Sequence, residues 1–398
     1  MTTQQAVIVA GARTAIGTAY RGSLADADAL DLATQAVAEA VKRSGIAPNE
    51  VDDVVLGESL YGGGDIARYA AIEAGLVNAP GIAHNRHCAS GLSALQTAAS
   101  SIIAGMDRVV VAGGVQSSST MPKTSRRVPG TDSWEEDWLA PSHRETADAP
   151  IRDMSITVGW NAAVKAGVSR EDMDAWSYRS HLRAIAGNDN GSFAQEIFPI
   201  EITRRDGSTF TFDVDEHPRR TSTLEKLASL KPLHPEIEGF SITAGNAAGV
   251  NDGAAALVLT SDDFAAANGL APLAVVRAWA SVGVPPADTG LAPTTVIPKV
   301  LGRAGITIAD VDLWEINEAF ASVPVAVTRQ LGIDDEIVNV LGSGCSLGHP
   351  VAMTGARMVL TLIYELRRRG GGTAVAAMCA GGGMASALVL EVPAPSGV

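Results

Sequence analysis

The sequence predicts an α/β protein made of two related halves with an inserted segment between them. Three observations lead to this prediction: apolar strand-like runs alternate with helical apolar spacing, one short pattern recurs late in the chain, and the middle of the chain breaks the alternation. Because strands that alternate with helices build βαβ units, we expect mixed, mostly parallel sheets that helices cover on both faces.

The first part of the chain supplies the clearest alternation of strands and helices. Its apolar runs predict strands at Val7–Ala10, Val51–Gly57 and Arg108–Gly114, and its helical spacing predicts helices at Leu30–Val41 and Ala67–Gly75. A further helix is expected to end at Gly105. Its apolar face consists of Leu92, Leu95, Ala98, Ala99, Ile102 and Ile103.

The later part of the chain repeats this plan. Segment Ser44–Asp52 recurs as Ala304–Asp312, and the strand that ends at Gly114 has a counterpart that begins near Ala374. We therefore divide the chain into residues 1–118 with 242–270 as an N-terminal half, residues 119–241 as an inserted loop domain, and residues 271–398 as a C-terminal half.

Composition and charge restrict the function classes. The 398 residues carry a net charge of −14, which argues against a nucleic-acid or anionic-membrane partner. No apolar run reaches the roughly 18–20 residues of a membrane span. The chain has 3 cysteines and starts directly with a strand pattern rather than a basic leader, so we expect free thiols, a reducing compartment and a cytoplasmic location.

Cys88 is the candidate nucleophile. It lies where a loop gives way to the predicted helix, and unpaired N–H groups at a helix N-terminus favour a thiolate over a thiol. A lone cysteine is, however, more often a small buried hydrophobic residue. Partners elsewhere in the chain must decide between these two interpretations.

Four later stretches place chemically capable residues beside glycine or proline. They are Ser241–Ala256, Glu315–Ala321, Asn339–Pro350 and Met378–Ala385. Among the histidines we favour His349, which glycine precedes and proline follows. We expect surface or structural roles for His143, His181, His217 and His234. A metal site is not expected, because the close set of His84, His87 and Cys88 has no second pair at ligand spacing.

These stretches together resemble the signature segments of the thiolase family, the acyl-CoA C-acyltransferases, over nearly the whole chain. The resemblance rests on motifs that occur in the family's order: Arg13-Thr14, Cys88-Ala89-Ser90-Gly91, Asp215-Glu216 with Arg219, Thr243–Asn246, Asn317–Phe320, Gly348-His349-Pro350 and Cys379–Gly383. It implies layered αβαβα packing of duplicated halves.

The resemblance also implies a reaction and a role for each site residue. Cys88 would attack the keto carbonyl of a 3-ketoacyl-CoA, and His349 would take protons from Cys88 and from the CoA thiol. Cys379 would exchange a proton with the α-carbon. One oxyanion hole would combine His349 with a water held by Asn317, and the other the backbone N–H groups of Cys88 and Gly381.

Coenzyme A enters this scheme as a co-substrate, and the resemblance implies no permanently bound cofactor. The expected partners are acyl-CoA and CoA, the expected assembly is a homodimer or homotetramer, and fatty-acid β-oxidation is one expected setting. Residues Arg219, Ala248 and Met154 are expected to contact the substrate or CoA. In the inserted segment, basic residues such as Lys123–Arg127 would suit a phosphate-bearing substrate or be ordinary surface charges.

Several positions depart from the pattern of acetoacetyl-CoA thiolases and leave the acyl preference open. The loop that usually reads His-Met-Gly is Asp153-Met154-Ser155, a usual serine is Ala248, and the region Gly290–Pro293 carries Ala292. Two other functions stay open: a decarboxylating ketoacyl synthase of the same superfamily, and a non-catalytic acyl-CoA-binding subunit with Cys88 and Cys379 as a redox pair. Cys379 and Asn317 favour the thiolase.

Overall fold

The computed structural model describes residues 4–59, 61 and 65–395, and it confirms the α/β class. Within that part of the chain, ten strands form one mixed sheet whose main path runs β12-β13-β14-β11-β1-β10-β5-β3-β4. The strands of the first half are β1 (Ala6–Arg13), β2 (Gly17–Thr18), β3 (Asp53–Gly57), β4 (Gly81–His84), β5 (Val109–Ser117) and β10 (Asn251–Ser261). Those of the second half are β11 (Ala274–Gly283), β12 (Leu313–Ile316), β13 (Gly372–Ala380) and β14 (Met384–Val392).

The sheet confirms the predicted duplication. Reading outward from its centre, β1-β10-β5-β3 in the first half has the same pairing directions as β11-β14-β13-β12 in the second. The recurring segments lie at matching places, since the turns Pro48–Glu50 and Ile308–Asp310 lead into β3 and β12. The halves join where β1 pairs with β11 over Val7–Ile8.

The expectation of mostly parallel strands is wrong. Parallel pairing is confined to β3 with β4, β3 with β5, and β12 with β13, whereas the other pairs of the main sheet are antiparallel. The reason is the connection that follows β5 in the first half and β13 in the second. A tight turn at 381–383 returns β14 against β13, and the long inserted segment returns β10 against β5 in the opposite direction.

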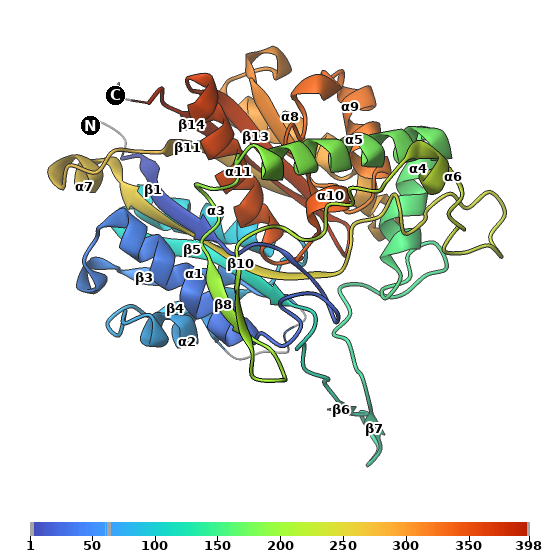
Figure 1. Cartoon of the computed structure of the whole chain (residues 1–398), viewed down its shortest axis with the longest axis horizontal. Helices are drawn as coiled ribbons and strands as arrows, with labels where there is room; N and C mark the ends of the chain where they lie inside the picture. Colours follow the sequence, from blue (N-terminus) through green and yellow to red (C-terminus); the bar gives the residue numbers. More distant parts are fainter. Residues whose placement is uncertain (1–3, 60, 62–64, 396–398) are drawn as a thin grey trace.

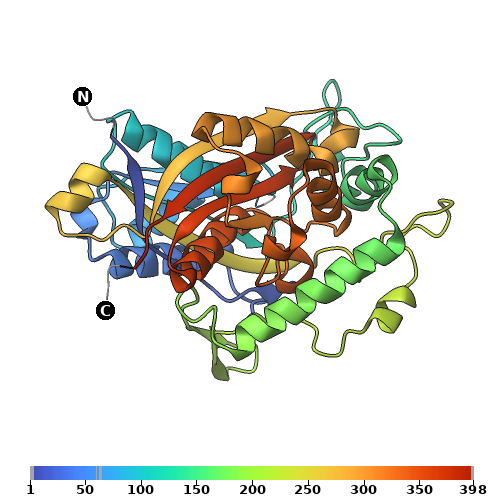
Figure 2. The ribbon, with the colours of Figure 1, turned by 90° about the horizontal axis from the view of Figure 1, so that it is seen from above.

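Helices cover the sheet and fill the space between its two halves (Figures 1 and 2). The outer helices are α1 (Ala29–Ser44) and α2 (Ile66–Glu73) on the first half, and α8 (Pro293–Ala304) and α9 (Ser322–Leu331) on the second. The two central helices are α3 (Ser90–Ile103) and α11 (Thr354–Arg369). They contact each other and strands of both halves, which gives the expected αβαβα order of layers.

The central helix α3 has the predicted apolar face with one exception. Leu92, Leu95 and Ile102 are fully buried, but Ile103 is 40% exposed at the end of the helix. The remaining short elements of the two halves are α7 (Asp262–Ala267), α10 (Gly344–Leu347) and the 3₁₀ turns Pro286–Leu291 and Asp335–Ile337. None of the helices in the described ranges is both long and apolar enough to cross a lipid bilayer.

The inserted segment packs against both halves: its helical part contacts α9 and α10 of the second half, whereas Glu196 and Asp215 pair with Arg13 on β1 of the first. A two-stranded hairpin of β6 (Arg126–Arg127) and β7 (Trp134–Glu135) protrudes, and the long helix α5 runs along one side (Figures 1 and 2). The other elements are a π-helix (Ser155–Trp160), α4 (Asn161–Ala166), α5 (Arg170–Asp189), α6 (Leu224–Ala228), β8 (Ile200–Thr203) and β9 (Thr209–Phe212). The residue boundaries of the three units stay a prediction.

Candidate active site

The two central helices meet at their first turns. A Cβ added to Gly91 of α3 would lie 2.5 Å from the carbonyl oxygen of Ala352, and a Cβ on Gly355 of α11 would collide with the backbone of Leu92. Each glycine is the second residue of its helix, so the contact follows the internal symmetry. Because only glycine permits this approach, it brings the segments that hold Cys88 and His349 to one region.

Cys88 lies half-buried between β4 and α3, two residues before the first helical residue. The residue before it, His87, has a φ of 47°. The backbone N–H groups of Gly381 and of Cys88 itself favour the thiolate of Cys88, but burial outweighs them and raises the pKa of the thiol. The electrostatics around Cys88 therefore favour the thiol over the expected thiolate.

Cys379 is buried near the end of β13, two residues before the glycine turn. Burial raises the pKa of its thiol, and the neighbouring Cys88 raises it further. Gly381 contributes its N–H group, but its own lack of a side chain is less critical than expected, since a Cβ there would meet its nearest neighbour at 3.7 Å. The strict need for glycine falls on Gly382 and Gly383, whose φ values are 82° and 76°.

His349 is held by three contacts just before α11. Its backbone N–H donates to Asn251 Oδ1 at 3.0 Å, its Nδ1 lies 2.7 Å from Thr354 Oγ1, and its Nε2 lies 3.4 Å from Asn317 Nδ2. The Thr354 hydroxyl donates its one proton to Pro350 O at 3.0 Å and must therefore accept from His349 Nδ1. This assigns the proton to Nδ1 and leaves the Nε2 lone pair facing the site.

The imidazole of His349 is neutral. Burial, with a smaller contribution from the Arg357 guanidinium, lowers the pKa of His349 to about 3. Because the pKa of the Cys88 thiol is raised, the resting site contains a thiol and a neutral imidazole rather than an ion pair. Proton transfer must then accompany the approach of a substrate.

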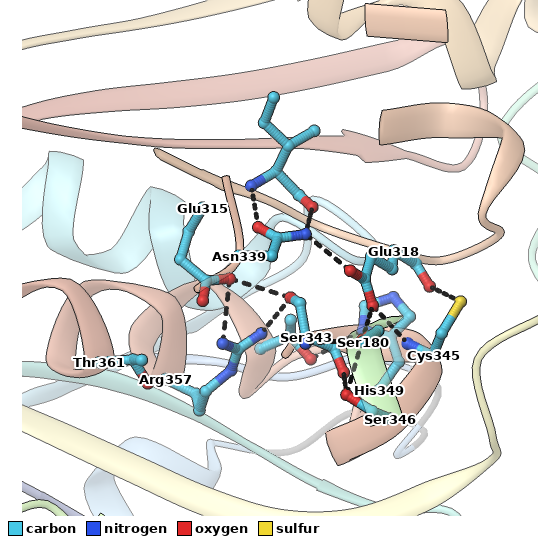
Figure 3. Close-up of polar contacts among 12 residues, drawn as sticks. Ser180, Glu315, Glu318, Asn339, Ser343, Cys345, Ser346, His349, Arg357 and Thr361 are labelled. Carbon is cyan, nitrogen blue, oxygen red and sulfur yellow. Dashed lines mark hydrogen bonds and ion pairs between the residues drawn. The ribbon is translucent and has the colours of Figure 1, made fainter. Parts of the chain in front are cut away.

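A buried polar network fixes the loop that carries Asn317 (Figure 3). The carboxylate of Glu318 accepts hydrogen bonds from Ser180 Oγ, Asn339 Nδ2 and the backbone N–H of Cys345, at 2.7–3.1 Å. Trp176 Nε1 donates to it as well, at 2.8 Å. The loop is thus tied to α5 and α10, and Asn317 is held beside His349.

A second buried group lies on the opposite side of Ser343 in the same network (Figure 3). Arg357 on α11 forms an ion pair with Glu315 at 3.1 Å and donates to Ser343 Oγ at 2.8 Å. Burial raises the pKa of Glu315 to about 7, against the opposing effect of Arg357. The guanidinium therefore links β12 to α11 and adds positive potential near His349.

The predicted substrate-contacting residues lie at different distances from this centre. Met154 is close, since its sulfur would lie 3.8 Å from a Cβ on Gly381. Ala248 contacts the loop that carries Asn317, since its backbone N–H donates to Ala319 O at 3.0 Å. Arg219 is exposed, and its backbone N–H donates to His181 on α5.

Asp153, one of the departures in sequence, forms an ion pair with His234. Asp153 Oδ2 lies 2.7 Å from His234 Nε2, and Glu236 Oε1 lies 2.8 Å from His234 Nδ1. The hydrogen bonds to Glu236 and Asp153 raise the pKa of His234, although its slight burial opposes them. The pair ties the turn that bears Met154 to the loop after α6.

Sequence reasoning missed four residues that orient the site, namely Asn251, Glu318, Thr354 and Arg357. Thr354 and Arg357 lie in the first turns of α11, the helix that follows His349. Their short distance in sequence from His349 could have identified them. Asn251 and Glu318 lie inside motifs already singled out. The contacts that reveal their roles are long-range and invisible in the sequence.

Buried histidines predict acid sensitivity of the fold. Burial lowers the pKa of His181 and His217 to about 4 and that of His349 to about 3. The unfolded chain therefore binds more protons than the folded chain below about pH 6.5, and stability falls as the pH falls through this range. We expect the free energy of unfolding to drop by about 2 kcal/mol per histidine between about pH 6.5 and about pH 5.

Urea unfolding followed by circular dichroism at both pH values measures this loss. The variant His181→Gln removes one of the three groups, so its pH dependence should be shallower than that of the wild type. An equally steep dependence in the variant would contradict the assignment of His181.

The site and the fold together define a class: duplicated α/β proteins with a cysteine before the first central helix and a histidine before the second. Comparison with known proteins agrees. The sequence matches the family description "Thiolase, N-terminal domain" over residues 6–263 and "Thiolase, C-terminal domain" over residues 270–392. The chain belongs to the thiolase family.

Individual relatives match over almost their whole length. An acetyl-CoA acetyltransferase of Pseudomonas aeruginosa is 40% identical, covering 97% of this chain and 99% of the relative. A 3-ketoacyl-CoA thiolase of Bacillus subtilis is 39% identical, with 98% and 100% covered. The crystal structure of the Bacillus anthracis acetyl-CoA acetyltransferase superimposes with a TM-score of 0.90 at 39% identity, covering 98% of this chain and 99% of that one.

A human mitochondrial 3-ketoacyl-CoA thiolase, solved in complex with CoA, superimposes with a TM-score of 0.89. Its sequence is 34% identical, and 98% of each chain is covered. The likeness therefore extends to a relative that binds CoA.

Proposed function

We propose that this protein is an acyltransferase that cleaves a 3-ketoacyl-CoA with CoA, or catalyses the reverse Claisen condensation, through an acyl-enzyme on Cys88. The observation that carries this proposal is the neighbouring pair of thiols, Cys88 and Cys379, with the backbone N–H groups of Cys88 and Gly381 close enough to favour negative charge on Cys88. N–H donors at this point suit the oxyanion that forms when a thioester carbonyl is attacked.

The cleavage half of the reaction follows from the arrangement of thiol and imidazole. His349 Nε2 takes the Cys88 proton as the sulfur attacks the keto carbonyl, and Nε2–H then becomes a donor near Asn317. The bond between the carbonyl carbon and the α-carbon breaks, and its electron pair forms the enolate of acetyl-CoA. Cys379 protonates the α-carbon, which releases acetyl-CoA.

The second half-reaction returns the acyl group to CoA. The His349 imidazolium first returns its proton to the Cys379 thiolate that the cleavage step left, and the neutral His349 then takes the proton of the CoA thiol as its sulfur attacks the Cys88 thioester. Cys88 leaves as a thiolate and recovers a proton. A thiolate suits both steps, because it is a good nucleophile and a good leaving group.

The inserted segment is proposed to bind CoA, with Arg219, Ala248 and Met154 as contacts. The structural support for CoA contacts differs from residue to residue in this segment. Met154 lies beside Gly381, and Arg219 is an exposed cation, whereas Arg126 and Arg220 are engaged in ion pairs with Glu135 and Asp189. A homodimer or homotetramer, a cytoplasmic location and a role in β-oxidation complete the proposal, and three free cysteines favour a reducing compartment.

The purified protein should convert acetoacetyl-CoA and CoA into two molecules of acetyl-CoA, which liquid chromatography can quantify. Release of carbon dioxide from malonyl-CoA without thiolysis would favour the ketoacyl synthase alternative. Binding of acyl-CoA without turnover would favour the non-catalytic subunit.

Thr354 is expected to act as a positioning residue for His349. The isosteric variant Thr354→Val removes the oxygen that accepts a hydrogen bond from His349 Nδ1–H. The tautomer with an unprotonated Nε2 is then no longer favoured, and we expect kcat/KM to fall about 10- to 100-fold. Thr354→Ser keeps the hydroxyl and should restore most of the activity. Rates measured across the pH range should show a changed profile in the valine variant alone, and equal behaviour of the two variants would refute the role.

A further inference from the structure

The sequence departure at Asp153 lies in the turn that leads into the π-helix Ser155–Trp160. Met154 stands between the two, and its sulfur would lie 3.8 Å from a Cβ on Gly381. Segments of π-helix are rare and occur frequently at functional sites. The position of this turn therefore decides where Met154 lies relative to the candidate active site.

Both carboxylate oxygens of Asp153 are engaged. Oδ1 accepts hydrogen bonds from the backbone N–H of Ser155 at 3.0 Å and from Ser155 Oγ at 2.6 Å, at the start of the π-helix. Oδ2 lies 2.7 Å from His234 Nε2, in the loop after α6 and 81 residues later in the chain. Asp153 thus joins the first turn of the π-helix to a distant loop.

His234 lies between two carboxylates. Its Nε2 faces Asp153, and its Nδ1 lies 2.8 Å from Glu236 Oε1; these are its ion pairs within the described part of the chain. An ionised carboxylate only accepts hydrogen bonds, so both contacts form together only when both ring nitrogens carry a proton. The hydrogen bonds to Glu236 and to Asp153 accordingly raise the pKa of His234. We refer to these three residues as the Asp153 triad.

Aromatic packing attaches the other end of the π-helix to the same loop. The ring of His234 meets that of Phe240 edge to face, with 4.9 Å between centroids, and Phe240 packs at 5.1 Å against Trp160, the last residue of the π-helix. The side chains of His234 and Asp153 are 24% and 34% exposed, so solvent weakens their ion pair but does not surround it. The aromatic contact does not depend on charge, whereas the contact of Asp153 does.

Loss of the His234 proton weakens one of these two attachments. A neutral imidazole has one N–H group, so it can donate to only one carboxylate and presents a lone pair to the other. A hydrogen bond that remains also loses its ionic part. Farther along the π-helix, Gly159 O still accepts from Ser322 Oγ at 2.8 Å. The change is therefore confined to the turn that bears Met154.

We infer that Asp153 and His234 are positioning residues for acyl-CoA binding: they hold the turn that carries Met154, and they hold it fully only while His234 is protonated. This inference rests on the proposed function and adds a control of substrate binding by pH. Because the proton on His234 is retained at low pH and lost as the pH rises, binding is tight on the acid side and weakens on the alkaline side.

The test measures binding of acetyl-CoA by isothermal titration calorimetry in a Cys88→Ala background, which cannot form the acyl-enzyme. The dissociation constant should rise about three- to tenfold between about pH 6 and about pH 9. With His234→Phe added, the aromatic contact stays but the cation is lost, so binding should be weak at both pH values. With His234→Arg added, the cation is permanent, and binding should be tight at both.

Asp26→Asn is the matched control. It breaks the ion pair of Asp26 with Arg205, in which the aspartate side chain is 40% exposed, close to the value for Asp153. The pH dependence of acetyl-CoA binding should stay that of the parent. Hydrogen–deuterium exchange of the peptide that covers residues 153–160 should be faster in His234→Phe than in the parent at about pH 6, and unchanged in Asp26→Asn.

Equal pH dependence in the parent and in both His234 variants would overturn the inference. Faster exchange in His234→Phe with unchanged affinity would also overturn it, since the triad would then support the fold without acting on binding. If acetyl-CoA binds as expected but the wild type does not cleave acetoacetyl-CoA, the proposed function fails and the positioning role stands. If the wild type cleaves acetoacetyl-CoA but the dissociation constant does not change with pH, the proposed function stands and the positioning role fails.

Discussion

Replacement of Cys88 by alanine is expected to abolish CoA-dependent cleavage of 3-ketoacyl-CoA, with a loss of at least about 10³-fold. The physical reason is that Cys88 is both attacking group and leaving group, and the backbone N–H groups of Gly381 and Cys88 favour negative charge on its sulfur. The assay measures acetyl-CoA formed from acetoacetyl-CoA and CoA. Mass spectrometry of the wild type should also show an acyl adduct on the peptide that contains Cys88.

Cys345→Ala provides the control for the loss of a thiol as such. Cys345 is buried in the core of the second half, where its thiol donates weakly to Glu318 O at 3.5 Å. This variant should keep its adduct on Cys88 and stay within a few-fold of wild-type turnover. Normal turnover in Cys88→Ala, or an adduct on another residue, would refute Cys88 as the nucleophile.

Replacement of Cys379 by alanine should separate the two halves of the reaction. We expect acylation of Cys88 by acetyl-CoA to persist, because the nucleophile, His349 and both N–H donors remain. Exchange of the α-protons of acetyl-CoA with deuterated water should fall by about 10²- to 10⁴-fold, the usual contribution of a positioned acid or base. Mass spectrometry measures both quantities on the same sample.

Cys379→Ser serves as the comparison for this variant. Its hydroxyl has nearly the same size and the same place on β13, but it is a weaker acid than a thiol. Exchange in the serine variant should therefore also be slow, while acylation stays intact. Wild-type exchange in the alanine variant would exclude Cys379 as the group that moves the α-proton.

The resting protonation states explain why these two thiols need a substrate to react. Burial raises the pKa of each thiol, and Cys88 raises the pKa of Cys379 further. A neutral His349 with its lone pair on Nε2 is ready to accept a proton, but its low pKa gives no thiolate in the empty site. Formation of charge is thus coupled to the hydrogen bonds that an oxyanion would receive.

The sequence by itself determined the α/β class and the two halves, and it supplied the proposed reactive side chains. These depend on local information: apolar periodicity sets strands such as β1 and helices such as α3, and glycine or proline near Cys88, His349 and Cys379 marks the turns that carry them. The recurrence of the Ser44–Asp52 pattern at Ala304–Asp312 was sufficient to predict the duplication, since similar local patterns favour similar local structures.

Only the tertiary structure decided the strand directions, the charge of Cys88 and the partners of His349. The direction of β10 depends on where a long insertion returns, which no local pattern encodes. The helix N-terminus before Ser90 favours a thiolate, but burial by β13 and its turn is a long-range effect and is the larger one. Likewise, Asn251 and Asn317 reach His349 from other elements, and the contact with Asn251 exists only once the two halves have packed.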